Sequence, residues 1–421
     1  MDLYVFVMII SLVCVLGFFN EKLTKLNYGI SLILLSTLIG LLAIGASVVF
    51  KNNTDTLSLL NNIQTLDIDE SVMKGSLCFI LFAASCHMDL ASFKSQAKRL
   101  VILSLVCTLL CAGIFGGLFY GASILLGIGI PLPVCLLFGS IVASTDPIAS
   151  AGIVSKFKFP KNISTLLRGE ALFNSIVSAI LFVCLTGVVN PGSSENAAAF
   201  ILKEVLGAIV VGVVVTGICY ILFRFTKNKN IAIFTGLMAV TISFVISEKF
   251  GFSSPIACLI CGLTFSILRS LFTKFDNKGK ITHFNSFWVT IDVFLNSIIY
   301  VILGLKFVHV LQIKNVVILA LAAIVASLAA RVISILLSSV LMGNVPDGYK
   351  RFSFIWLMTW SGLKGGIAAA LAMSTKSFLP ENTYNIVLGG TFAIVFFTMV
   401  IQGLTINPVY KRIRRSQASS K

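Results

Sequence analysis

The sequence predicts an all-α polytopic membrane protein with about thirteen transmembrane helices. Hydrophobic residues make up 57% of the 421 residues and charged residues only 11%, whereas soluble domains carry about 25% charged residues. The mean hydropathy is +1.01. Apolar runs of about 20 residues, long enough to cross hydrocarbon, recur from end to end, so little chain is left for a soluble domain.

The apolar runs define the expected spans in order. They are residues 3–19, 28–50, 72–88, 100–127, 132–154, 166–189, 202–223, 231–248, 254–268, 287–304, 315–342, 352–374 and 384–409. The first run has no basic leader and no small-residue cleavage site, so we expect a retained helix and not a signal peptide.

A single transporter domain is therefore expected over residues 1–421. Its first half covers about 1–268, a basic cytoplasmic linker covers 269–286, and the second half covers 287–409. Residues 410–421 form a short basic tail.

The net charge is +16, and the basic residues are concentrated on one side of the membrane. If the amino terminus lies outside, alternate loops are cytoplasmic and hold 23 of the 32 basic residues: Lys22, Lys25, Lys94, Lys98, Arg99, Lys156, Lys158, Lys161, Arg168, Arg224, Lys227, Lys229, Arg269, Lys274, Lys278, Lys280, Lys350, Arg351, Lys411, Arg412, Arg414, Arg415 and Lys421. Basic residues concentrate in cytoplasmic loops of membrane proteins. The pattern predicts a cell-membrane protein with a cytoplasmic carboxyl terminus, and the basic excess requires no nucleic acid.

Ten cysteines are scattered through the spans. Cys258 and Cys261 form a C-x-x-C, but they lie in an apolar helix without further cysteine or histidine ligands nearby, so packing is the better interpretation. No nucleotide-binding loop is present. We expect no enzyme activity and no cofactor.

The fifth span contains the most informative residues. Asp146 lies inside a run that should be in hydrocarbon, where a carboxylate is expensive and usually functional. Pro147 removes a backbone donor and disfavours helical geometry at the residue before it, so the helix should break at the charge. Broken helices with loose carbonyls beside an ionisable group form the cation sites of many transporters.

The twelfth span contains a second interruption. Gly362, Gly365 and Gly366 flank Lys364 within an apolar run. The two interrupted spans are seven apart and so cross the membrane in opposite directions, as in an inverted-repeat transporter with two crossed broken helices. Close helix packing alone would explain the glycines, but it does not call for a lysine.

The sixth span supplies further oxygen ligands. Glu170, Asn174 and Ser178 are four residues apart and share one helix face, with Ser175 about 100° round from Asn174. Together with Asp146 and Thr145 they suit an alkali cation or a proton. Glu170 needs a partner at such depth.

Two intramembrane cations could pair with Glu170, namely Lys364 and Arg331. The sequence leaves that choice open, and a structural ion pair is favoured over direct transport by Glu170. On the tenth span, Asp292 and Asn296 are four residues apart near the expected cytoplasmic end. They line an entry funnel or form a solvated helix end.

Motifs along nearly the whole chain resemble the monovalent cation/proton antiporter family, in the branch of NhaP-type and sodium/proton exchangers. The similar segments are Ala143-Ser-Thr-Asp-Pro147, Gly169-Glu-Ala-Leu-Phe-Asn174, Phe294-Leu-Asn-Ser-Ile-Ile-Tyr-Val-Ile-Leu-Gly304, Trp360-Ser-Gly-Leu-Lys-Gly365 and Phe397-Thr-Met-Val-Ile-Gln-Gly-Leu-Thr405. The resemblance implies a homodimer with a dimerisation unit and a mobile six-helix core. It also implies exchange of sodium, potassium or lithium for protons by an elevator-like movement.

The departures from the family pattern fall at the ion site. The family's Asn-Asp pair, whose aspartate is the principal carrier, reads Asn174-Ser175 here. The usual serine of that motif is Ala171, an acidic position of the third span is Ala83, and the usual arginine of the twelfth is Lys364. Asp146 is then the one remaining unpaired deep carboxylate and would take over as carrier.

Three functional hypotheses follow. In the first, Asp146 alternately binds a proton and a cation, which gives one-for-one, electroneutral antiport. In the second, the protein has lost cation/proton exchange and moves another small solute. In the third, it is a non-transporting sensor or partner protein. The retained Asp146, Asn174, Glu170 and Lys364 favour the first, because a structural remnant has no reason to keep a costly deep charge.

Overall fold

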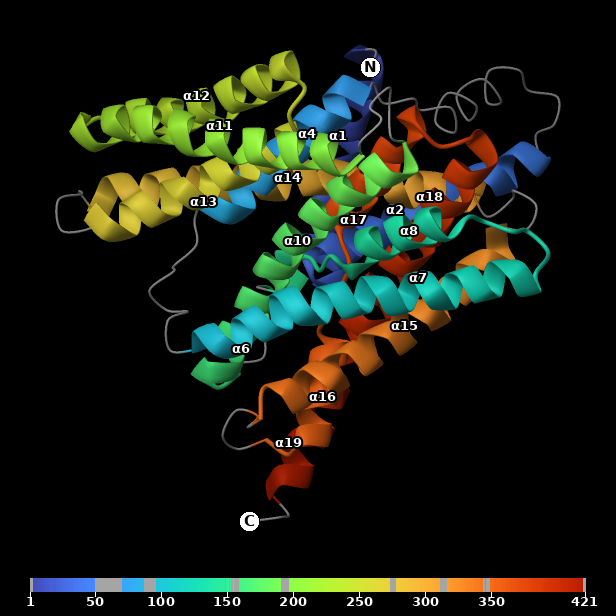
Figure 1. Cartoon of the computed structure of the whole chain (residues 1–421). Helices are drawn as coiled ribbons and strands as arrows, with labels where there is room; N and C mark the ends of the chain where they lie inside the picture. The colour runs from blue at the N-terminus through green and yellow to red at the C-terminus, as the bar shows by residue number, and fades with distance from the viewer. Residues whose placement is uncertain are drawn as a thin grey trace.

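The structure is a computed structural model that describes residues 3–49, 70–86, 96–147, 149–150, 152, 154, 159–190, 197–272, 278–310, 316–343, 345 and 349–418 (Figure 1). Within those ranges every regular element is a helix. The helices are α1 (Leu3–Phe19), η1 (Asn20–Thr24), α2 (Tyr28–Val49), α4 (Glu70–Cys86), α6 (Ala97–Val101), η3 (Ile102–Val106), α7 (Cys107–Leu125), α8 (Leu132–Ala143), α10 (Lys161–Val189), α11 (Ala197–Phe225), α12 (Lys229–Phe250), α13 (Ser254–Phe272), α14 (Lys278–Val310), α15 (Val316–Leu341), α16 (Arg351–Trp360), α17 (Gly366–Ser374), η5 (Thr375–Ser377), α18 (Glu381–Phe396), η6 (Phe397–Gln402) and α19 (Gly403–Ala418).

These helices confirm the predicted fold class. In the part of the chain that the structure describes, nine helical segments are long and apolar enough to cross a membrane, and Tyr28–Leu42, Lys74–Cys86 and Leu132–Ala143 are shorter apolar helices. Each predicted span coincides with one helix or with consecutive helical pieces. Within the described residues, the helix is interrupted by non-helical residues in the fifth and twelfth spans: α8 ends at Ala143, and α16 and α17 are separated by residues 361–365.

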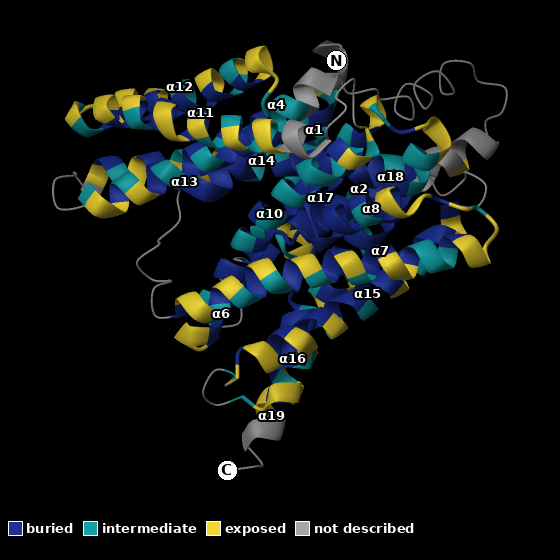
Figure 2. Cartoon of the chain, in the orientation of Figure 1, coloured by how far each residue is buried: buried dark blue, intermediate teal, exposed yellow. Residues whose placement is uncertain are grey.

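The helices pack around two apolar clusters. One joins α4, α11, α12, α13 and the first half of α14, and it contains Cys258 and Cys261 among its buried residues. The larger one joins α1, α2, α7, α8, α10, the second half of α14 and α15 to α19. In Figure 1, α11, α12 and α13 lie together, apart from α7 and α15. Figure 2 shows exposed residues on the outer faces of α11, α12 and α7, as expected of surfaces that meet lipid tails.

Small residues allow the helices to cross closely. A side chain added at Gly139 of α8 would meet the backbone of Ala112 on α7, and one added at Gly262 of α13 would meet the Phe82 carbonyl oxygen of α4, 2.7 Å away. Membrane helices use such positions because the apolar solvent gives them little other drive to associate. The close α7–α8 crossing holds the first half of the broken span in place.

The segment predicted as a cytoplasmic linker is largely helical where the structure describes it. α13 continues to Phe272 and α14 begins at Lys278. Residues 273–277 of the predicted linker and 419–421 of the predicted tail lie outside the described residues.

Gly139→Ala should destabilise the protein, because the new methyl group would meet the α7 backbone, which cannot rotate away as a side chain can. We expect a loss of about 1–3 kcal/mol in the free energy of unfolding, measured by thermal unfolding of purified protein in detergent. Gly113→Ala on α7 is the matched control, since no atom lies within 4 Å of the added carbon. Equal stability of the two variants would contradict the close crossing.

Candidate functional site

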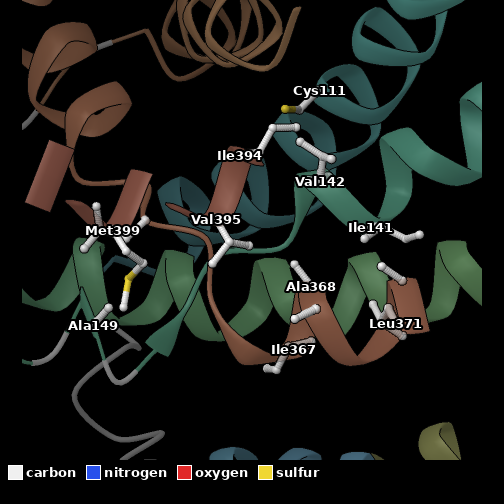
Figure 3. Packing of buried hydrophobic residues seen from close by; sticks show 14 of the residues in the cluster. Cys111, Ile141, Val142, Ala149, Ile367, Ala368, Leu371, Ile394, Val395 and Met399 are labelled. Atoms are coloured by element: carbon white, nitrogen blue, oxygen red, sulfur yellow. The ribbon is translucent and has the colours of Figure 1, made fainter. Parts of the chain in front are cut away.

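The two interrupted spans meet at their breaks. After α8 ends at Ala143, residues 144–146 leave helical geometry and a helical turn resumes at Pro147. The backbone N–H of Asp146 donates to the carbonyl oxygen of Leu363, in the break between α16 and α17, at 2.8 Å. In Figure 3, Val142 and Ala149 mark the two sides of the first break, while Ile367 and Ala368 mark the start of α17. Backbone groups freed by one break are thus satisfied by the other.

The carboxylate of Asp146 lies at the centre of this crossing and is 4% exposed. Its Oδ1 accepts a hydrogen bond from the Ala149 N–H at 3.1 Å, which caps the helical turn that follows, with Pro147 in the first helical position. Its Oδ2 accepts a hydrogen bond from the Tyr300 hydroxyl of α14. The predicted break therefore occurs because Asp146 and Pro147 together begin a new half-helix inside the membrane.

The three glycines of the twelfth span each touch a polar side chain of the site. A methyl group at Gly365 would overlap the Asp146 carboxylate, and one at Gly366 would overlap the Asn296 amide oxygen. One at Gly362 would lie 2.8 Å from the Arg331 guanidinium. Close helix packing is therefore not their main role. They bring the amino terminus of α17, with its partial positive charge, against Asp146.

Lys364, in the second break, binds the carboxyl-terminal end of α8. Its Nζ donates to the Ala143 carbonyl oxygen at 3.3 Å, at the carboxyl terminus of α8, and its backbone N–H donates to Thr398 Oγ1 at 3.1 Å. The side chain is 2% exposed. A cation at a helix carboxyl terminus offsets the partial negative charge there, so Lys364 stabilises the first half of the broken fifth span.

Glu170 is paired with Arg331, which resolves the choice that the sequence left open. Arg331 Nη2 lies 2.8 Å from Glu170 Oε1, and both side chains are buried. Arg331 also donates to the Met358 carbonyl oxygen at 3.4 Å, in the last turn of α16. The pair thereby joins α10, α15 and the first half of the twelfth span.

The polar residues around position 174 hold the first break in shape. The Asn174 amide donates to Thr145 Oγ1 at 3.2 Å and to Glu170 Oε1 at 3.1 Å, and its oxygen accepts from Thr108 Oγ1 at 2.6 Å. The Ser175 hydroxyl donates to the loose Thr145 carbonyl oxygen at 2.6 Å. Ser175 thus satisfies a backbone acceptor that the break exposes, as buried carbonyls require.

One face of α14 carries site residues that sequence reasoning placed wrongly or missed. Asp292 and Asn296 are 4% and 3% exposed, so the interpretation as a solvated helix end is wrong. The Asn296 amide donates to Asp292 Oδ1 at 2.8 Å. The description of Asp146 as the one unpaired deep carboxylate is also wrong, since Asp292 is a second buried carboxylate and Tyr300 bonds to Asp146. The four-residue spacing from Asp292 through Asn296 to Tyr300 could have signalled this face.

A cavity of about 250 Å³ leads to this face of α14. It is lined by Asn27, Tyr28, Gly29, Ala149, Gly152, Val293, Asn296, Ser297, Tyr300 and Met399. Two of its lining residues, Tyr300 and Asn296, also lie against Asp146 and Gly366. The cavity is large enough for several water molecules or a hydrated cation, because one water takes about 30 Å³ of liquid.

Comparison with known proteins gives a consistent result across the chain. The family model described as "Sodium/hydrogen exchanger, transmembrane" matches residues 7–412. The chain is 28% identical over 369 residues to the Na(+)/H(+) antiporter NhaP of Pseudomonas aeruginosa, which covers 85% of each protein. It is 22% identical to the Na(+)/H(+) antiporter NhaH of Halobacillus aidingensis, over 98% of each protein.

The fold is similar to that of a solved structure. The sodium proton antiporter MjNhaP1 from Methanocaldococcus jannaschii, at pH 8, superposes with a TM-score of 0.75 over 96% of this chain and 100% of that one. The identity over the superposition is 22%, so this likeness supports the fold alone.

Arg331→Ala should be strongly destabilising, because it leaves the Glu170 carboxylate buried without its cation. Loss of one partner of a buried pair costs about 3–5 kcal/mol. Combining it with Glu170→Gln removes the stranded charge, so the double variant should be more stable than Arg331→Ala alone. Thermal unfolding of the two single variants and the double variant measures the interaction free energy between residues 170 and 331. If the two single losses of stability simply add up in the double variant, the pairing is contradicted.

Proposed function

The chain belongs to the sodium/hydrogen exchanger family, and from that premise we propose that it is a secondary transporter that exchanges a monovalent cation for protons. The observation that carries the proposal is Asp146, a buried carboxylate at the crossing of two broken helices, whose hydrogen-bond partner Tyr300 lines a cavity. Sodium is the first candidate cation, since the relatives are named sodium/proton antiporters. Potassium and lithium remain candidates on ligand chemistry, because carboxylate and neutral oxygens bind all three.

Exchange follows from competition at the carboxylate. A cation that reaches Asp146 displaces a proton and takes the place of the Tyr300 hydroxyl at Oδ2. Thr145, Asn174 and Ser175 hold the break open for it and supply nearby hydroxyl and amide oxygens. The Glu170–Arg331 ion pair and the hydrogen bond from Lys364 to Ala143 hold the half-helices in position. One cation for one proton leaves the charge of the site unchanged, so the proposed exchange is electroneutral.

The proposed setting is a cell membrane, with the amino terminus outside and the carboxyl terminus in the cytoplasm. The positive-inside distribution of the basic residues supports this orientation. It makes the cavity beside Asn296 and Tyr300 cytoplasmic, because Asn27 then belongs to the first cytoplasmic loop and Tyr28 begins α2 directly after it. A homodimer is proposed on the resemblance, with the bilayer and the exchanged ions as the other partners.

The direct test uses proteoliposomes that contain a pH-sensitive dye, with sodium, potassium and lithium added in turn. We expect a cation-driven pH change in the wild type and at least about a hundredfold loss in Asp146→Asn, because transport then lacks its charged ligand. Gly113→Ala on α7 is the control outside the site and should keep most of the activity, since no atom lies within 4 Å of the added carbon. A folded wild type that responds to none of the three ions would overturn the proposal and favour another solute or a partner-binding role.

Electroneutrality is tested separately by imposing a membrane potential with valinomycin and a potassium gradient on sodium-loaded vesicles. The initial rate of sodium-driven proton movement should be the same with and without the potential, because no net charge crosses. A rate that changes with the sign of the potential would mean that the stoichiometry is not one for one.

A further inference from the structure

We propose that the two functions of the carrier are divided between two residues: Asp146 binds the cation and Asp292 carries the exchanged proton. The inference rests on the proposed cation/proton exchange, and it moves the exchanged proton from Asp146, where competition at one carboxylate would place it, to Asp292. It starts from the observation that Asp292 on α14 is a buried carboxylate outside the Glu170–Arg331 ion pair, as Asp146 is on the fifth span.

The two carboxylates are connected by a continuous set of contacts. Asn296 lies one turn from Asp292 on α14 and donates to it, and its amide oxygen touches Gly366. The neighbouring Gly365 touches Asp146, and Tyr300, one further turn along α14, donates to Asp146. Asn296 and Tyr300 thus connect Asp292 to Asp146 along one face of α14.

The two carboxylates have different hydrogen-bond partners. Asp146 faces the start of α17, whose partial positive charge stabilises a negative group, and it accepts a backbone N–H from Ala149. Asp292 accepts a hydrogen bond from the neutral amide of Asn296. When two carboxylic acids lie in such different surroundings, one is held in its ionised form and the other in its protonated form. The surroundings stabilise the ionised form of Asp146 and leave Asp292 as the protonated acid.

The remaining ionisable groups around Asp292 come from the helices that pack on α14. Cys86 of α4 and Arg269 of α13 are buried ionisable side chains on helices that share an apolar cluster with the first half of α14. The Arg269 guanidinium donates to Asn285, about two turns before Asp292 on α14. Among the residues that the structure describes, the ion pair Arg331–Glu170 joins α15 to α10 and does not include Asp292.

The exchange balances with this division. Before the cation binds, Asp146 is ionised and Asp292 carries a proton, so the pair has one negative charge. The arriving cation is bound by Asp146, and its positive charge drives the proton from the Asp292 carboxyl to water in the cavity that ends on Asn296 and Tyr300. The pair then carries two negative charges and one positive charge, and the net charge is unchanged.

Two transport modes separate this inference from the proposed function. Sodium/sodium counterflow, followed with radioactive sodium, requires a cation site but no proton carrier, whereas sodium-driven pH change requires both. Asp292→Asn keeps the acceptor for Asn296 and removes the titrating group. We expect counterflow within about twofold of wild type and at least about a tenfold loss of sodium-driven proton movement. Asp292→Glu should restore proton movement, and Asp146→Asn should abolish both modes.

Three outcomes would overturn the inference. Asp292→Asn could drive a pH change as fast as wild type, so that the proton is carried elsewhere. It could lose both modes equally while thermal unfolding and elution volume match wild type, which would mean that Asp292 only supports the cation site. If the wild type shows neither mode, the proposed exchange itself fails and the inference falls with it.

Discussion

Everything in this site depends on one constraint: hydrocarbon offers no water to satisfy a charge or a broken backbone. Each of the two broken spans satisfies this constraint for the other. Lys364, in the second break, donates to the carbonyl end of α8, while Asp146, in the first break, faces the amino end of α17. Each costly charge thus stabilises helix ends that the opposite break creates. Neither span could be interrupted alone without leaving a charge and several peptide groups unsatisfied.

The same constraint explains residues that look incidental. Gly365 and Gly366 are required because a methyl group at either position would occupy the space of Asp146 or Asn296. Arg331 balances Glu170 and also donates to the Met358 carbonyl in the last turn of α16, so one guanidinium supports a charge and a helix end. Ser175 satisfies the Thr145 carbonyl. A serine at this position therefore supports the break through a neutral hydrogen bond.

The sequence was sufficient for the spans, both breaks and Asp146, because these follow from hydropathy, proline geometry and the cost of a buried charge. It was insufficient for α14. The apolar run predicted a span over residues 287–304, which put Asp292 near its end, whereas the helix runs over Lys278–Val310 and buries that carboxylate. Tyr300 was missed because a tyrosine in an apolar run is ordinary until its hydroxyl partner is known. The partner of Glu170 depended on tertiary packing, which spacing along the chain does not encode.

The position of the second carboxylate also bears on how binding is coupled to movement. In a site with both acids on the broken core, their separation would be fixed by one rigid unit. Here Asp146 is on the interrupted fifth span and Asp292 is on α14, which packs with both apolar clusters. Any displacement between the broken helices and α14 changes the distance between the two negative charges. Because charge repulsion in a medium of low dielectric falls with that distance, a bound cation or proton favours the arrangement in which the carboxylates lie close, and an empty, doubly charged pair opposes it.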